Sequence, residues 1–431
     1  MFRPPSSRND ETNASGGWIT WVIPIVPIPM ALWANAIARH PEAIQAGSSH
    51  LRPVRRIFAY QAHPLSERGP TISDWAMVSG CSVDLASLCN LGTRMRRLTS
   101  MTTYSYNPRM QGFDPKFRDL PDYIIGVTRE IWEDRGLATL RAYYADDIPV
   151  RSPSGVVVGN EAVIAATLAT LAEFPDRQLF AEDVIWSGDE VSGFLSSHRI
   201  ISTATHGAEG VFGPATGKRL RYRVVADCAA KDNQIYDEWL IRDQGAIVRQ
   251  LGIHPKQFAA DEIDRQGGPD QAKRPFTPET DQRGRYSGTG NDNEWGQRYE
   301  SLLVALMAGD IAAVERDYDR AVNLEHPGGM TGVGWSDAER FWLRLRSSFP
   351  SATFRVDHRI GRHDEHLSPR AALRWSLSGS HDGWGAFGAP TGAPVHIMGI
   401  NHAEYGPWGL RREYVLIDET AIWKQILLHT G

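Results

Sequence analysis

The sequence predicts an α+β fold that occurs twice in tandem, and two observations support this prediction. The string THGAEGVFGPATG at 205–217 returns as SHDGWGAFGAPTG at 380–392, which is 175 positions later. Within each copy, segments of helical character precede segments of strand character, an order typical of α+β domains rather than of a doubly wound parallel sheet. Each copy has the length of an ordinary domain, so we expect two separate cores instead of a solenoid.

Three helices are expected at the start of each copy. Asp122 can cap the first helix of the first copy, a second helical stretch covers 137–144, and Asn160 can cap the third. In the second copy, Ser336 and Glu339 have the spacing of a capping box, which predicts the start of the corresponding helix.

Four strands are expected after the helices of each copy, separated by Gly, Asp and Asn turn residues. In the first copy they cover 179–188, 193–207, 218–230 and 233–243, and in the second copy 354–362, 371–381, 393–405 and 410–418. The same offset of 175 relates the last strand of each copy, so Glu238 aligns with Glu413.

The domain plan follows from the repeat and from changes in composition. We expect an N-terminal extension at 1–112, a first domain at 113–256, a polar linker at 257–292 and a second domain at 293–431. The first 110 residues contain eleven arginines and no lysine, and their apolar stretch at 18–38 is interrupted by three prolines. Prolines disrupt a helix, which disfavours a membrane span or a signal peptide, and translation starting at Met101 or Met110 is an alternative.

Composition limits the class of function. The hydrophobic fraction of 42% and the charged fraction of 23% are those of a globular protein, and the net charge of −5 offers no basic footprint for nucleic acid. The cysteines Cys81, Cys89 and Cys228 lack metal-ligand spacing, which favours a reducing, cytoplasmic location. No dinucleotide fingerprint, phosphate loop or nucleophile elbow is present, so neither a nucleotide cofactor nor a serine nucleophile is indicated.

The repeated strings resemble the SnoaL-like polyketide cyclase family, whose domains have the nuclear transport factor 2 fold. TATHGAEGVFGPATGKRL and YDEWLIRDQGAIVRQLG follow the family pattern T-H-x-G-x-F and then E-x-W-x-x-x-D, and the likeness covers 116–256 and again 293–428. The chain departs from the pattern at Ile200, Ala215 and Tyr414. The resemblance implies two cone-shaped α+β barrels, each a curved mixed sheet wrapped around the N-terminal helices, with a ligand pocket inside.

The same resemblance implies an aspartate as acid/base, and Asp243 and Asp418 match the last position of the pattern. By alternation, Trp239 and Ile241 share a strand face with Asp243. Burial would have to raise the pKa of such an aspartate above its usual value of about 3.9. The alternative is that Asp243 caps the turn DQG or pairs with a nearby arginine.

The second copy offers equivalent candidates and one addition. Tyr414 and Leu416 share a face with Asp418, as Trp239 and Ile241 do with Asp243. His402 and Glu404 share a face of the preceding strand, but no third ligand with fixed spacing accompanies them, so we expect no metal site and keep His402 as a substrate-binding candidate.

His206 and His381 end their strands immediately before the glycine-rich turns that carry Phe212 and Phe387. An imidazole there could polarise a substrate oxygen, and the two phenylalanines could contact the ligand. The alternative is that each histidine hydrogen-bonds its turn. Arg199 faces away from His206 by alternation, which favours an outer salt bridge.

Two hypotheses for function follow. The first is a cofactor-free acid/base enzyme that converts a small carbonyl compound by cyclisation, isomerisation, dehydration or hydrolysis. The second is a non-catalytic module that binds a small molecule or mediates dimerisation. In either case the two copies are expected to pack as an internal pseudo-dimer, with a homo-oligomer also open, and neither nucleic acid nor a membrane is the expected partner.

Overall fold

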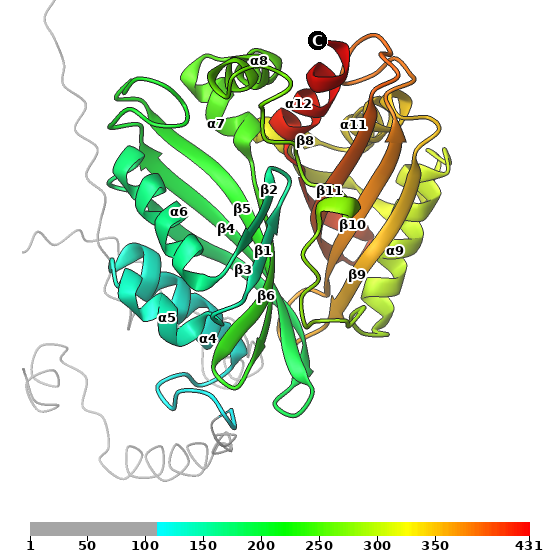
Figure 1. The fold of residues 1–431 in the computed structure, drawn as a ribbon. Helices are drawn as coiled ribbons and strands as arrows, with labels where there is room; N and C mark the ends of the chain where they lie inside the picture. Colours follow the sequence, from blue (N-terminus) through cyan, green and yellow to red (C-terminus); the bar gives the residue numbers. More distant parts are fainter. Residues whose placement is uncertain (1–109) are drawn as a thin grey trace, which may run out of the picture. The chain divides into compact units, whose positions relative to one another are not determined.

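The computed structural model describes residues 110–431 (Figure 1). The extension predicted at 1–112, with its apolar stretch and the candidate start Met101, lies outside the described residues except for the last three positions. Met110 itself is buried in the core of the first domain. None of the helices in the described part of the chain is long and apolar enough to cross a membrane.

The first domain is a mixed six-stranded sheet with helices before and after it. Its elements are α4 (Leu120–Thr128), the π-helical turn η2 (Arg129–Glu133), η3 (Leu137–Thr139), α5 (Leu140–Tyr143), β1 (Pro149–Ser152), β2 (Gly155–Val158), α6 (Asn160–Glu173), β3 (Gln178–Asp189), β4 (Gly193–Thr205), β5 (Arg219–Lys231), β6 (Gln234–Arg242), α7 (Gln244–Leu251) and α8 (Pro255–Arg265). The strand order is β2-β1-β6-β5-β4-β3, in which only β1 and β6 pair in parallel.

The second domain repeats this architecture. Its elements are α9 (Glu294–Met307), α10 (Ala313–Asp317), β7 (Tyr318–His326), η5 (Pro327–Gly329), β8 (Met330–Val333), α11 (Trp335–Ser348), β9 (Thr353–Arg362), β10 (Arg370–Ser380), β11 (Pro394–Gly406), β12 (Gly409–Leu416) and α12 (Glu419–Thr430). The strand order β8-β7-β12-β11-β10-β9 is equivalent, again with one parallel pair, β7 and β12. The two mixed sheets confirm the predicted α+β fold in two tandem copies.

The helix starts differ from the prediction in detail. Asp119, not Asp122, caps α4 by accepting the backbone N–H of Asp122 at 2.8 Å, while the Asp122 carboxylate binds Arg118. The third helix of each copy follows a glycine with positive φ, Gly159 at 88° and Gly334 at 80°. A glycine adopts this conformation at little cost, so it takes the capping position predicted for Asn160 and Ser336.

Each sheet is covered on both faces. Helices α5 and α6 lie against one face of the first sheet, and α9 lies against the second sheet (Figure 1). The opposite faces meet in an apolar cluster, where Val225 and Ile241 of the first sheet pack with Met398, Ile400 and Leu416 of the second. Side chains of β6 therefore pack on both faces of the strand, and most of them are buried or partly buried.

The segment predicted as a polar linker takes part in this packing. Helix α8 extends to Arg265, and Phe276 is buried in the apolar cluster between the sheets. Farther along, the Tyr286 hydroxyl lies 2.7 Å from Nε2 of His358 in the second sheet. The segment therefore holds ordered contacts with both domains, while its exact boundaries stay a prediction.

Candidate active site

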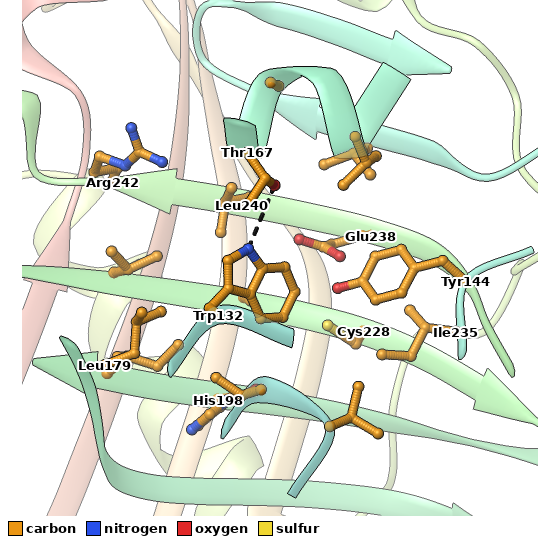
Figure 2. Close-up of a pocket in the computed structure, with 18 of the residues that line it drawn as sticks. Trp132, Tyr144, Thr167, Leu179, His198, Cys228, Ile235, Glu238, Leu240 and Arg242 are labelled. Atoms are coloured by element: carbon orange, nitrogen blue, oxygen red, sulfur yellow. Dashed lines mark hydrogen bonds between the residues drawn. The ribbon is translucent and has the colours of Figure 1, made fainter. Parts of the chain in front are cut away.

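The first domain contains a cavity of about 170 Å³ between its N-terminal helices and the inner face of its sheet (Figure 2). Most of the area of its wall is apolar. The polar and sulfur-containing residues of the lining are Thr128, Trp132, Tyr144, Ser152, Thr167, Thr170, Arg177, His198, Cys228, Glu238 and Arg242. A concave, mostly apolar wall with convergent polar groups is typical of a small-molecule site.

Alternation along the strands sets which side chains reach the cavity. Glu238, Leu240 and Arg242 of β6 line it, as do His198 of β4 and Cys228 of β5. Their immediate neighbours in sequence point to the other face of the sheet. The cavity is therefore formed by one alternate set of residues from each strand.

Glu238 is the carboxylate at the centre of this wall. It is only 5% exposed, and its Oε2 accepts no hydrogen bond from another described residue. Burial raises the pKa of Glu238 to about 7, and hydrogen bonds from Tyr144 and Cys228 offset part of that effect. Figure 2 shows these three side chains close together beside the Trp132 indole. A carboxyl with a pKa near neutrality can both take up and release a proton at pH 7.

The neighbours of Glu238 are held in their neutral forms. Burial raises the pKa of the Tyr144 hydroxyl and of the Cys228 thiol well above their ordinary values, so both keep their protons. Burial, together with the adjacent Arg199, lowers the pKa of His198 to about 3. His198 is therefore a neutral imidazole, and its Nε2 is buried without a partner among the described residues. It can bind a ligand oxygen or hydroxyl but cannot serve as a cationic acid.

The corresponding region of the second domain is filled. Glu413 aligns with Glu238, but its Oε1 accepts hydrogen bonds from Tyr299 at 2.8 Å and Tyr318 at 2.9 Å. Trp342 Nε1 donates to the Tyr318 hydroxyl at 3.0 Å, and Trp375 is fully buried in the same core. At the offset of 175, the two tryptophans replace Thr167 and Ile200 of the first domain, both of which line its cavity.

The predicted substrate-binding residues of β6 lie on its other face. Ile241 packs in the apolar cluster between the sheets, and the Trp239 ring stacks on the Arg374 guanidinium at 3.6 Å. Arg374 Nη1 in turn donates to Asp227 Oδ2 at 2.9 Å. The predicted ligand-binding face of β6 was the one with the aromatic residue, whereas the residues of β6 that line the cavity are Glu238, Leu240 and Arg242.

Tyr414, Leu416 and His402 lie between the sheets in the same way. The Tyr414 ring stacks on Arg199 at 3.5 Å, and His402 Nε2 lies 2.8 Å from the Ser197 hydroxyl. Arg199 also pairs with Glu182 and Glu404, as the predicted salt bridge on the outer face requires. These contacts join the domains rather than line the cavity of the first domain.

Asp243 and Asp418 are helix caps. Asp243 Oδ1 accepts the N–H groups of Ala246 and Gly328 at 2.9 and 2.8 Å, and its Oδ2 accepts that of Gly329 at 3.0 Å. Burial raises the pKa of Asp243 to about 6, although these hydrogen bonds act to lower it. A smaller cavity of about 120 Å³ between the domains touches Asp243, but backbone donors already occupy both of its oxygens. The capping alternative is what the structure shows.

Asp418 has the same role at the start of α12. Its Oδ1 accepts the backbone N–H and the hydroxyl of Thr420, at 2.9 and 2.7 Å. Burial raises the pKa of Asp418 to about 7. Since it does not face the cavity, this shift reflects its position in the core.

His206 and His381 bind their own turns. Nδ1 of His206 lies 3.1 Å from the Thr216 hydroxyl, and Nδ1 of His381 lies 3.0 Å from that of Thr391. Phe212 packs against Phe174, with ring centroids 5.7 Å apart, and Phe387 packs against Phe349 at 5.5 Å. All four predicted residues therefore stabilise the glycine-rich turns instead of lining the cavity.

Residues 123–251, which include the whole cavity wall, match the family described as SnoaL-like polyketide cyclase. The first domain is SnoaL-like. This confirms the resemblance found in the sequence, and the second domain, with the same strand order, is its tandem copy. No curated protein matches the chain.

Several solved structures are similar to about a third of the chain. IdmH from Streptomyces antibioticus, a candidate polyketide cyclase, is 26% identical over 31% of this chain and 98% of its own, with a TM-score of 0.28. AclR from Streptomyces galilaeus, a candidate hydroxylase, is 19% identical over 31% of this chain and 94% of its own, with a TM-score of 0.27. A SnoaL-like polyketide cyclase from Agrobacterium tumefaciens is 19% identical over 31% and 97%, also with a TM-score of 0.27. Since these scores are below 0.5, the fold assignment depends on the observed strand order and the family match.

Glu238, Tyr144 and His198 were not predicted as site residues. The repeat contained one indication, because Glu238 and Glu413 occupy the same position of a strand in both copies. A glutamate is rarely buried unless it has a partner or a function, so its presence at this position in both copies is a signal. Among the described residues, no three His, Cys, Asp or Glu side chains converge as a metal site would require.

Proposed function

We propose that the first domain is an acid/base enzyme that acts on a small carbonyl compound in its cavity, with Glu238 as the proton-transfer group. The observation that carries this proposal is a buried carboxyl with a pKa near 7 and one free oxygen on a mostly apolar cavity wall. That combination is characteristic of groups that move protons at neutral pH.

The chemistry can be derived from the residues present. Ionised Glu238 takes a proton from a carbon next to the substrate carbonyl, and the electron pair of the C–H bond delocalises onto the carbonyl oxygen. The neutral His198 imidazole can donate a hydrogen bond to that oxygen. The protonated Glu238 can then return the proton to another carbon, which isomerises the substrate, or to a departing hydroxyl group, which dehydrates it. If the enolate attacks a second carbonyl instead, the result is cyclisation.

The cavity volume limits the size of the substrate. Pockets for drug-sized ligands are about 300–1,000 Å³, whereas an apolar cavity of about 150 Å³ accommodates a single benzene ring. At about 170 Å³, this cavity suits a molecule with one ring or an equivalent chain. The proposal is therefore a small monocyclic or acyclic carbonyl compound rather than a polycyclic polyketide.

We propose that the second domain is not catalytic and stabilises the first domain. Its carboxylate Glu413 is bonded to Tyr299 and Tyr318, and aromatic side chains occupy the space equivalent to the cavity. Its sheet also closes the outer face of the first sheet. A non-catalytic binding module is the second hypothesis, because a mostly apolar cavity also suits a protein that binds a small molecule without converting it.

The test is exchange of substrate C–H protons for deuterium, followed by NMR on small cyclic ketones and 1,3-dicarbonyl compounds in D2O. We expect exchange with the wild-type protein and a loss of about 10²- to 10⁴-fold in Glu238→Gln, the usual contribution of general acid/base catalysis. Glu413→Gln is the matched control and should exchange at the wild-type rate. Binding without exchange by the wild type would favour the binding module.

A further inference from the structure

Two arginines line the cavity, and Figure 2 shows Arg242 at the end away from Tyr144. Arg242 is the last residue of β6, and Figure 2 shows it beyond Leu240 at the opposite end of this strand from Ile235. Arg177, immediately before β3, is only 5% exposed and also lines the cavity. The Nε atoms of both guanidinium groups are buried and have no hydrogen-bond partner among residues 110–431.

The charges of these two arginines are uncompensated. Within the described part of the chain, no carboxylate forms an ion pair with Arg177 or Arg242, and the cationic side chains that act on Arg177 are Arg242 and Arg135. Burial lowers the pKa of Arg177 to about 10, and the positive charges of Arg242 and Arg135 add to this effect, opposed by Tyr222. Burying like charges together without a counter-ion is costly.

Other buried arginines of the chain form ion pairs with carboxylates. Arg151 pairs with Asp237, Arg199 with Glu182 and Arg374 with Asp227. An arginine in the interior of this protein thus normally has a carboxylate partner. Arg177, which is buried, and Arg242, which is partly buried, have no such partner, and both lie at a cavity wall.

The second domain supplies an internal comparison. At the offset of 175, Arg177 and Arg242 correspond to Ala352 and Ile417, both of which are buried apolar residues. The arginines are therefore present in the copy with a cavity and absent from the copy whose interior is filled. A role in folding common to both copies does not account for them.

We propose that Arg177 and Arg242 bind a carboxylate group of the substrate, which makes the substrate a small carbonyl acid. Planar guanidinium groups match the geometry of a carboxylate, and the anion would supply the missing counter-charge. Glu238 and Arg242 are four residues apart on one strand, about 13 Å between their Cα atoms at the usual rise. The carboxylate and the reacting carbon thus lie toward opposite ends of the molecule. The position of the reacting carbon depends on the proposed function, whereas the anion site does not.

The experiment compares 4-oxocyclohexanecarboxylate with 4-oxocyclohexanecarboxamide, a ring ketone with and without the charge. Affinity is measured by calorimetry and deuterium exchange by NMR on the full chain. We expect the acid to bind roughly 10- to 100-fold more tightly than the amide, the usual effect of charged hydrogen bonds. Arg177→Met and Arg242→Met should each reduce this preference, and the surface variant Arg141→Met should keep it.

Three further readouts separate the possible outcomes. Glu238→Gln should retain the preference for the acid while losing exchange, so a failure of the proposed chemistry would leave the anion site intact. Without ligand, Arg177→Met should raise the denaturation midpoint, because it removes an uncompensated buried charge, whereas Arg374→Met should lower it. Equal affinity for acid and amide, or a preference unchanged in both cavity variants, would overturn the carboxylate site.

Discussion

Glu238 and Glu413 occupy equivalent positions in the two sheets, yet their carboxyl groups have different surroundings. Both oxygens of Glu413 accept hydrogen bonds from tyrosine hydroxyls, whereas Oε2 of Glu238 has no donor among the described residues. Burial raises the pKa of each carboxyl to about 7. The repeat therefore contains one carboxyl group that faces a cavity and one that is hydrogen-bonded into a core.

The first prediction concerns the pH dependence of exchange. If Glu238 acts as the base, only its ionised form removes a proton, so kcat/KM should rise with pH and reach half its maximum near pH 7. The measurement is kcat/KM for deuterium exchange of a ketone between pH 5 and 9. A rate that does not vary across this range would exclude Glu238 as the base.

The second prediction concerns stability and uses Glu413. An unfolded glutamate has a pKa of about 4.3, so between that pH and about 7 the folded state holds a proton that the unfolded state has released. The free energy of unfolding therefore falls as pH rises through this window. Glu413→Gln removes this titration and should become more stable relative to wild type from pH 5 to pH 8. Urea denaturation at several pH values measures the difference, and parallel curves would contradict the assignment.

The third prediction separates a cap from a catalyst at Asp243. Asparagine keeps one carbonyl oxygen but replaces the other with an N–H group, which faces the Gly329 or Gly328 donor. Asp243→Asn should lower the free energy of unfolding by about 1–2 kcal/mol, as loss of a cap does. Exchange per folded molecule should be unchanged. A loss of exchange without a loss of stability would restore Asp243 as a catalytic candidate.

The sequence predicted the fold well because the information was local or repeated. The offset of 175, the alternation in the strands and the glycine-rich turns each constrain the architecture. It did not predict the cavity, because Trp239 and Glu238 both lie on buried faces of β6. Alternation shows that these two residues point in opposite directions, but it cannot show which direction leads to helices and which to a second sheet. That distinction depends on how the two domains pack against each other. Residues far apart in the sequence determine this packing.

The fourth prediction tests the contact between the domains. Arg374 is buried, pairs with Asp227 and stacks on Trp239, so Arg374→Ala leaves the Asp227 carboxylate without its partner. The free energy of unfolding should fall by about 3–5 kcal/mol, the usual effect of breaking a buried ion pair. The control is the exposed pair of Arg141 and Glu161, where Arg141→Ala should leave the denaturation midpoint unchanged. Equal effects of the two variants would mean that the inter-domain pair contributes no more than a surface contact.

The last prediction exchanges cavity and core between the two copies. Thr167→Trp introduces the side chain that the second domain has at Trp342, and the cavity beside Trp132 offers space for it. The variant should fold, lose ligand binding and lose deuterium exchange, because the indole occupies the space of the substrate. The reciprocal variant Trp342→Thr removes a fully buried ring and leaves the Tyr318 hydroxyl without its indole donor. It should cost about 3–5 kcal/mol of stability, as large-to-small core substitutions of aromatic residues do. Denaturation midpoints and ligand calorimetry on both variants check these outcomes. If Thr167→Trp still bound the ketone with wild-type affinity, the ligand would have to lie outside the cavity that Glu238 faces.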